Sequence, residues 1–201
     1  MGTARSIGAA KHGRGCWARP PLPLSVISDE RDTLKHMLYE ELFAKLAEAR
    51  IRYVVVGGVA LVLHGVVRFT AGLDLLVALE EENLRSFVAA MTARAYGPKL
   101  PVSVDDLLDP RIRARWKRER GMQVLSFYHP QRPLELVDVF IDEPINFTAV
   151  ENAKQVFRAR GVEIPVASIA HLKQLKVLSG RPQDLADIEA LEDLEREERE
   201  K

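Results

Sequence analysis

The alternation of apolar and polar side chains divides most of the chain into predicted helices and strands. Across residues 34–49 apolar residues recur every three or four positions, the spacing of a helix with one buried stripe. Residues 51–56 form a β-branched run with no charge except Arg52, which predicts a strand buried on both faces. Short apolar or alternating runs predict further strands at 73–79, 122–128, 134–141, 155–158 and 162–166. Helical composition predicts further helices at 59–64, from 80, and at 102–108, 168–178 and 182–198.

This order of elements predicts an α/β (α+β) domain with a mixed β-sheet flanked by helices and closed by C-terminal helices. The connection between the strands at 53 and 73 is too short for an ordinary parallel crossover, so these two strands are expected to be antiparallel. The strands at 122–128 and 134–141 are joined by a turn with two prolines, which predicts a hairpin.

Length and composition are those of one globular domain with charged ends. We expect a disordered leader at 1–28, a folded domain at 29–192 and a charged tail at 193–201. The formal net charge is zero, so any basic surface must be local. Cys16 is the single cysteine, which excludes an internal disulfide and a cysteine-based zinc site and suits a reducing cytoplasm. No apolar run reaches the roughly 18–20 residues that span a bilayer, so no membrane association is expected.

Two acidic residues interrupt runs that are otherwise buried. Asp74 stands among Leu73, Leu75 and Leu76, and Asp138 stands between Val137 and Val139. An acid inside a buried strand must be paired or must bind a ligand, because an isolated buried charge is costly. Upstream, Gly57 and Gly58 end a strand and open a helix, where backbone N–H groups can approach a phosphate.

These residues, in this order, resemble a known family. A strand ending in Gly57 and Gly58, then Arg68 and Thr70, then Asp74 and finally Asp138 is similar to the minimal nucleotidyltransferases, in particular to the AbiEii-like toxins of toxin–antitoxin systems. Residues 164–188 resemble the closing helices of the same group, so that the likeness covers roughly residues 34–192.

The resemblance implies a nucleotidyltransferase fold, an NTP substrate and Mg²⁺ or Mn²⁺ as the cofactor. It implies Asp74 and Asp138 as catalytic metal ligands, with Gly57, Gly58, Arg68, Thr70 and Lys176 around the nucleotide. The residues alone leave other roles open. Arg68 contacts phosphate or braces Asp74, Thr70 is a turn residue, and Lys176 is an exposed lysine on an amphipathic helix. Arg181, Asp184 and Asp187 have the i, i+3 spacing of a local ion-pair network.

One position departs from the family pattern. The first acid of a pair two residues apart is replaced by Gly72, and side chains two apart on a strand share one face. Two of three carboxylates therefore remain for a two-metal arrangement, in which two ions sit roughly 4 Å apart. The missing first carboxylate is therefore expected to weaken catalysis more than nucleotide binding.

A basic segment at 111–120 offers another site. It holds six basic residues in ten, and Arg113, Arg115 and Lys117 with the ring of Trp116 are candidate contacts to nucleic acid. The alternative is a solvated surface helix.

The leading hypothesis is a cytoplasmic nucleotidyltransferase that transfers a nucleoside monophosphate from an NTP to an RNA or protein acceptor, as a toxin with an antitoxin partner. A degenerate member that binds nucleotide or a partner without catalysis is the first alternative. A nucleic-acid-binding module that uses residues 111–120 is the second.

Overall fold

The structure is a computed structural model that describes residues 39–70, 72–159 and 161–200. The described residues belong to one compact unit, Leu34–Lys201, and the other unit, Met1–Thr33, lies outside them. The leader expected at 1–28 and the first turn of the helix expected at 34–49 therefore fall outside the description. No helix among the described residues is long and apolar enough to cross a membrane.

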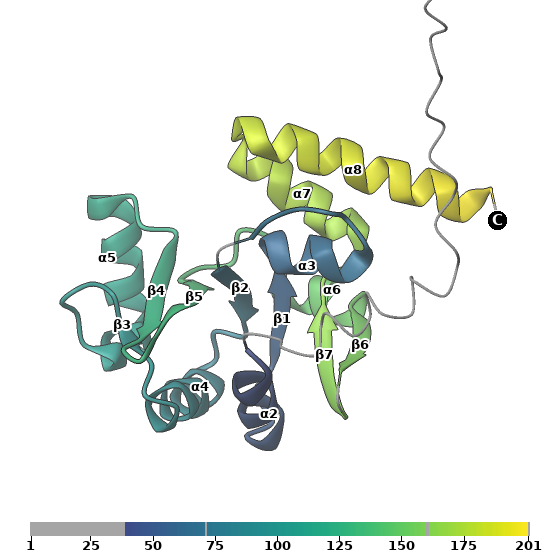
Figure 1. Ribbon diagram of the computed structural model, residues 1–201. Coiled ribbons are helices and arrows are strands. Elements are labelled where there is room, and N and C mark those ends of the chain that lie inside the picture. Colours follow the sequence, from purple (N-terminus) through teal and green to yellow (C-terminus); the bar gives the residue numbers. More distant parts are fainter. Residues whose placement is uncertain (1–38, 71, 160, 201) are drawn as a thin grey trace, which may run out of the picture. The chain divides into compact units, whose positions relative to one another are not determined.

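The helices and strands follow the predicted order, shown in Figure 1. The strands are β1 Tyr53–Val56, β2 Gly72–Val77, β3 Gly97–Pro98, β4 Val124–His129, β5 Arg132–Phe140, β6 Gln155–Ala159 and β7 Val162–Val166. The helices are α2 Glu40–Glu48, α3 Gly57–His64, α4 Glu81–Ala93, α5 Pro110–Arg120, α6 Phe147–Asn152, α7 Ile169–Ser179 and α8 Pro182–Arg199, with a 3-10 turn η3 at Val104–Leu107. The helix expected at 102–108 is thus a single 3-10 turn, and β3 and α6 were not predicted. The helix α8 continues through most of the segment expected to be a tail.

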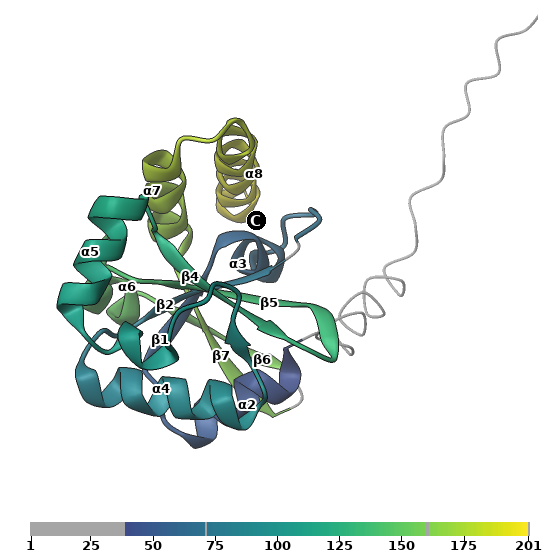
Figure 2. The same ribbon diagram turned by 90° about the vertical axis from the view of Figure 1, so that its left-hand side faces the viewer.

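The seven strands form one mixed sheet in the order β3-β4-β5-β2-β1-β7-β6. The strands β1 and β2 are antiparallel, as the short connection predicted, whereas β2 with β5 and β1 with β7 are parallel. The hairpin β4–β5 is antiparallel. Helices α2 and α4 cover one side of the sheet and α3, α7 and α8 lie on the other, as both views show (Figures 1 and 2). The prediction of a mixed α/β sheet flanked by helices is confirmed.

Burial alternates along β2, β4 and β5, and this alternation separates a packed face from an open face. Leu125, Phe127, Val137 and Val139 point into the core and are fully buried. The residues between them are partly or largely exposed, so the helices among the described residues leave that part of the sheet partly open. We call this surface the open face; it is made of Gly72, Asp74, Val124, Ser126, Tyr128, Leu134, Leu136, Asp138 and Phe140.

Candidate active site

The two predicted acids lie side by side on the open face. In the parallel pairing of β2 with β5, Asp74 is directly opposite Asp138. Neighbouring strands are about 4.8 Å apart, so the two carboxylates share one small volume. Burial, together with the nearby Asp138 carboxylate, raises the pKa of Asp74 to about 6, although the charges of Lys176 and Arg181 act in the opposite direction. A pair of like charges in one site is the arrangement that a cation stabilises.

The Gly57 and Gly58 turn packs directly against Asp74. Gly57 has φ +64°, in the left-handed region, and a Cβ there would lie 2.0 Å from Asp74 Oδ2. The Gly58 backbone N–H donates a hydrogen bond to the Asp74 carboxylate. A Cβ on Gly58 would lie 2.4 Å from Thr70 Oγ1. Both positions therefore need glycine for close approach, and the turn already faces an anionic group.

Gly72 leaves a space on the open face. It lies opposite Leu136 on β5, two residues before Asp74 on the same side of the sheet. A Cβ added to Gly72 would meet its nearest atom, the Leu136 carbonyl oxygen, at 3.5 Å, an ordinary contact. A Cβ would thus fit there without distorting the strand.

The donor set suits one divalent ion better than two. Among the described residues no group of three His, Cys, Asp or Glu side chains converges on a common point. Mg²⁺ is commonly held by one or two carboxylates together with substrate phosphates and water, which Asp74 and Asp138 can provide. A second ion would need the shared carboxylate that Gly72 lacks.

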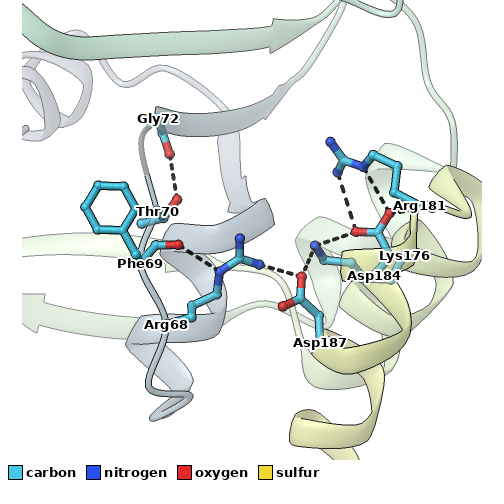
Figure 3. A network of polar contacts seen from close by, with 8 residues as sticks. All are labelled: Arg68, Phe69, Thr70, Gly72, Lys176, Arg181, Asp184 and Asp187. Atoms are coloured by element: carbon cyan, nitrogen blue, oxygen red, sulfur yellow. Dashed lines mark hydrogen bonds and ion pairs between the residues drawn. The ribbon is translucent and has the colours of Figure 1, made fainter.

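Arg68 and Thr70, which lie between α3 and β2, both contact other parts of the chain. Arg68 Nη1 forms an ion pair with Asp187 Oδ2 of α8 at 2.5 Å, and Arg68 Nε donates to the Phe69 carbonyl oxygen (Figure 3). The interpretation that Arg68 braces Asp74 is therefore wrong, since its acidic partner is Asp187. Thr70 Oγ1 donates to the Gly72 carbonyl oxygen at 3.3 Å, which agrees with its interpretation as a turn residue.

Lys176 is the centre of a buried ion network. Its Nζ lies 2.8 Å from Asp184 Oδ1 and 2.5 Å from Asp187 Oδ2, and its side chain is 8% exposed. Arg181 Nε in turn pairs with Asp184 at 3.0 Å. The i, i+3 spacing predicted the Arg181–Asp184 pair correctly, but the exposed lysine expected at 176 is wrong, because α7 and α8 pack around it. Figure 3 shows how the network ties these two helices to the Arg68 segment.

The basic segment forms the helix α5, and two of its four candidate contacts face inward. Trp116 is 3% exposed and belongs to the core, so a base cannot stack on it in this conformation. Arg113 is 9% exposed and donates to the carbonyl oxygens of Leu107 and Leu108. Lys117 forms an ion pair with Asp142. Arg115 is exposed on the surface of α5.

Comparison with known proteins identifies the fold. No protein-family model matches the chain, and no curated protein matches it. Among solved structures, a nucleotidyltransferase of Thermotoga maritima (TM1012) aligns with a TM-score of 0.50 at 14% identity, over 84% of this chain and 95% of that one. The enzyme ANT(2")-Ia, in complex with adenylyl-2"-tobramycin, aligns with a TM-score of 0.50 at 12% identity, over 79% of this chain and 91% of that one. The chain therefore has a nucleotidyltransferase-like fold.

Proposed function

We propose that the protein binds a nucleoside triphosphate with one divalent cation and transfers its nucleoside monophosphate to an acceptor hydroxyl. The observation that carries the proposal is the register of β2 and β5, which sets Asp74 opposite Asp138 on the open face. The Gly57 and Gly58 turn against Asp74 adds backbone donors where a polyphosphate would lie.

Asp74 and Asp138 would hold Mg²⁺ or Mn²⁺, which neutralises phosphate charge when bound. In the transfer, the acceptor oxygen forms a bond to the α-phosphorus, the bond to the bridging oxygen breaks, and pyrophosphate leaves. The acceptor proton passes to a base. Asp74, with a pKa of about 6, is mostly ionised at neutral pH and can serve as that base or as a ligand. Arg181 and Lys176 add positive charge near the carboxylates.

Binding without transfer is the second candidate, and Gly72 favours it. Without the third carboxylate only one ion is held well, and one ion supports nucleotide binding more readily than an in-line displacement between two ions. The space beside Leu136 makes this candidate testable, because an aspartate can be introduced there.

The class of acceptor, the cellular location and the protein partner are also part of the proposal. RNA and protein acceptors, an antitoxin partner and a cytoplasmic location follow from the sequence resemblance. ANT(2")-Ia, whose structure holds an adenylylated antibiotic, adds hydroxyl-bearing small molecules to the acceptor classes that a screen should include. Contact of Arg115 and Lys117 with nucleic acid stays a prediction.

The test is transfer of label from α-³²P-NTP to cell-extract acceptors in the presence of Mg²⁺ or Mn²⁺. The wild type is compared with Asp74→Asn, Asp138→Asn and Gly72→Asp. Transfer by the wild type that both asparagine variants abolish supports the enzyme. Transfer only by Gly72→Asp supports binding without catalysis. No transfer and no NTP binding by any form would refute both candidates.

A further inference from the structure

The outward side chains of β4 and β5 form an uncharged surface that continues directly from the carboxylate pair. In the antiparallel hairpin Ser126 lies opposite Asp138, and Tyr128 lies opposite Leu136. Asp74, Asp138 and Ser126 therefore lie in one row across β2, β5 and β4. Leu136 and Tyr128 lie in a neighbouring row across β5 and β4. With strands about 4.8 Å apart and residues about 3.3 Å apart, Tyr128 lies about 8 Å from Asp138, measured between Cα atoms.

This surface is apolar, and the described residues leave it open. Tyr128 is 42% exposed and Leu134 is 73% exposed, although Phe127, which precedes Tyr128, is fully buried. Within the described part of the chain the hydroxyls of Ser126 and Tyr128 make no hydrogen bond to a side chain or to the backbone. From 134 to 140 on β5, Asp138 is the one charged side chain on this face. Large apolar side chains left open beside a polar site are typical of a ligand surface.

The position of the Gly57 and Gly58 turn indicates whether this surface faces the nucleotide or the acceptor. Val56, which precedes the turn, lies opposite Asp74 on β1, so the turn approaches the carboxylates from the β1 side. The β4–β5 surface lies on the other side of the same pair. In phosphoryl transfer the attacking and leaving oxygens are roughly in line. If the polyphosphate lies against the turn, the acceptor must approach from the β4–β5 side.

We infer that Ser126, Tyr128, Leu134 and Leu136 form the acceptor subsite, and that it takes a neutral molecule with a ring or flat apolar face next to its hydroxyl. The ring would lie on Tyr128 and Leu134, and Ser126 would hydrogen-bond the hydroxyl beside Asp138. Among the described residues, the outward side chains of β4 and β5 include no acid other than Asp138, so this surface would not attract a polycationic acceptor. The inference rests on the proposed function, because it assigns a substrate class to that same site.

The test uses two probes that differ only in the ring, phenyl β-D-glucoside and methyl β-D-glucoside. Their binding is measured by ligand-observed NMR on the full-length protein with Mg²⁺ and a non-hydrolysable α,β-methylene NTP. Binding of that NTP analogue is measured separately. The variants are Tyr128→Ala, Tyr128→Phe and Ser126→Ala, and Leu178→Ala is the control because Leu178 is an exposed apolar residue (62%) on α7.

We expect the wild type to prefer the phenyl probe and Tyr128→Ala to weaken its binding about tenfold, the size of a lost ring stack. Tyr128→Phe and Leu178→Ala should bind it like the wild type, and NTP-analogue binding should be unchanged in all variants. Equal binding of the two probes, or an unaffected Tyr128→Ala, overturns the inference. Loss of NTP-analogue binding in Tyr128→Ala alone also overturns it, because Tyr128 would then contact the nucleotide. Failure of the wild type to bind the NTP analogue instead refutes the proposed function.

Discussion

Replacing Lys176 with methionine tests the buried network that joins α7 and α8 to the Arg68 segment. The Lys176 side chain is 8% exposed, and its two carboxylate partners, Asp184 and Asp187, are 1% and 3% exposed. Removing one member of a buried ion pair costs about 3–5 kcal/mol, because the remaining charge stays buried without compensation. Arg68 and Arg181 still contact these carboxylates, so we expect a loss near the lower limit, about 3 kcal/mol.

Urea unfolding followed by far-UV circular dichroism measures this loss. With a slope of about 2 kcal/mol per molar, 3 kcal/mol lowers the midpoint by about 1.5 M. Lys173→Met is the matched control, because Lys173 lies on the same helix as Lys176 and pairs with Glu195 of α8 at 2.8 Å, but both of these side chains are more than a quarter exposed. That pair should contribute at most about 1 kcal/mol.

The pH dependence of the same difference gives a second criterion. Burial alone would raise the pKa of Asp184, but hydrogen bonds from Lys176 and Arg181 hold it well below its usual range. A depressed pKa stabilises the fold above the unfolded pKa of about 3.9, and this stability is lost as the pH falls. Without Lys176 this contribution shrinks, so the difference in unfolding free energy between wild type and Lys176→Met should stay nearly constant from pH 7 to about pH 4 and narrow as the pH falls below about 4. A loss at pH 7 no larger than that of Lys173→Met, or a gap independent of pH, would refute the reasoning.

Three further changes test other parts of the fold and site. Gly57→Ala should destabilise the protein by at least about 1–2 kcal/mol in thermal melts, because of its left-handed φ and the contact at 2.0 Å with Asp74; wild-type stability would contradict the packed turn. The pKa of Asp74 is raised to about 6 in the fold, so its contribution to stability is present below about pH 4 and lost as the pH rises through 6. Without divalent cations, Asp74→Asn should therefore exceed the wild type in stability at pH 8 by up to about 3 kcal/mol, and the excess should vanish below pH 4; a constant difference would argue against the shift. Trp116→Ala should cost about 3–5 kcal/mol in urea unfolding, whereas Arg115→Ala should change stability by less than about 0.5 kcal/mol; similar effects would contradict the burial of Trp116.

The local features of the site were predictable because they depend on short stretches of chain. A β-branched run that ends in two glycines predicts a buried strand and a tight turn, and in the structure the buried strand β1 ends at Val56, directly before Gly57. Acids inside apolar runs predicted that Asp74 and Asp138 lie on strands. Their pairing across the sheet could not be predicted from the sequence, because it depends on the register between two strands more than fifty residues apart.

Side-chain environments that depend on packing were predicted less well. The basic composition of α5 indicated a charged surface, yet Trp116 and Arg113 point inward, because a helix with few apolar residues uses those it has to contact the core. Lys176 looked like an ordinary exposed lysine, since neither the packing of α8 nor the approach of Asp187 from the next helix is encoded in its neighbours. Ion pairs between two helices depend on the tertiary fold. The spacing of charged residues along the sequence predicts only ion pairs within one or two turns of the same helix.

The most direct test of the central claim is the affinity for a non-hydrolysable α,β-methylene NTP, measured by calorimetry with Mg²⁺ and with EDTA. If Asp74 and Asp138 form one site for a metal-bound nucleotide, the wild type binds only with the cation. Asp138→Asn should then weaken binding at least about tenfold, the loss of about 1.4 kcal/mol or more. Gly72→Asp should bind at least as tightly as the wild type. Binding that is equal in EDTA, or unchanged in Asp138→Asn, would contradict the assignment of the carboxylate pair as the nucleotide site.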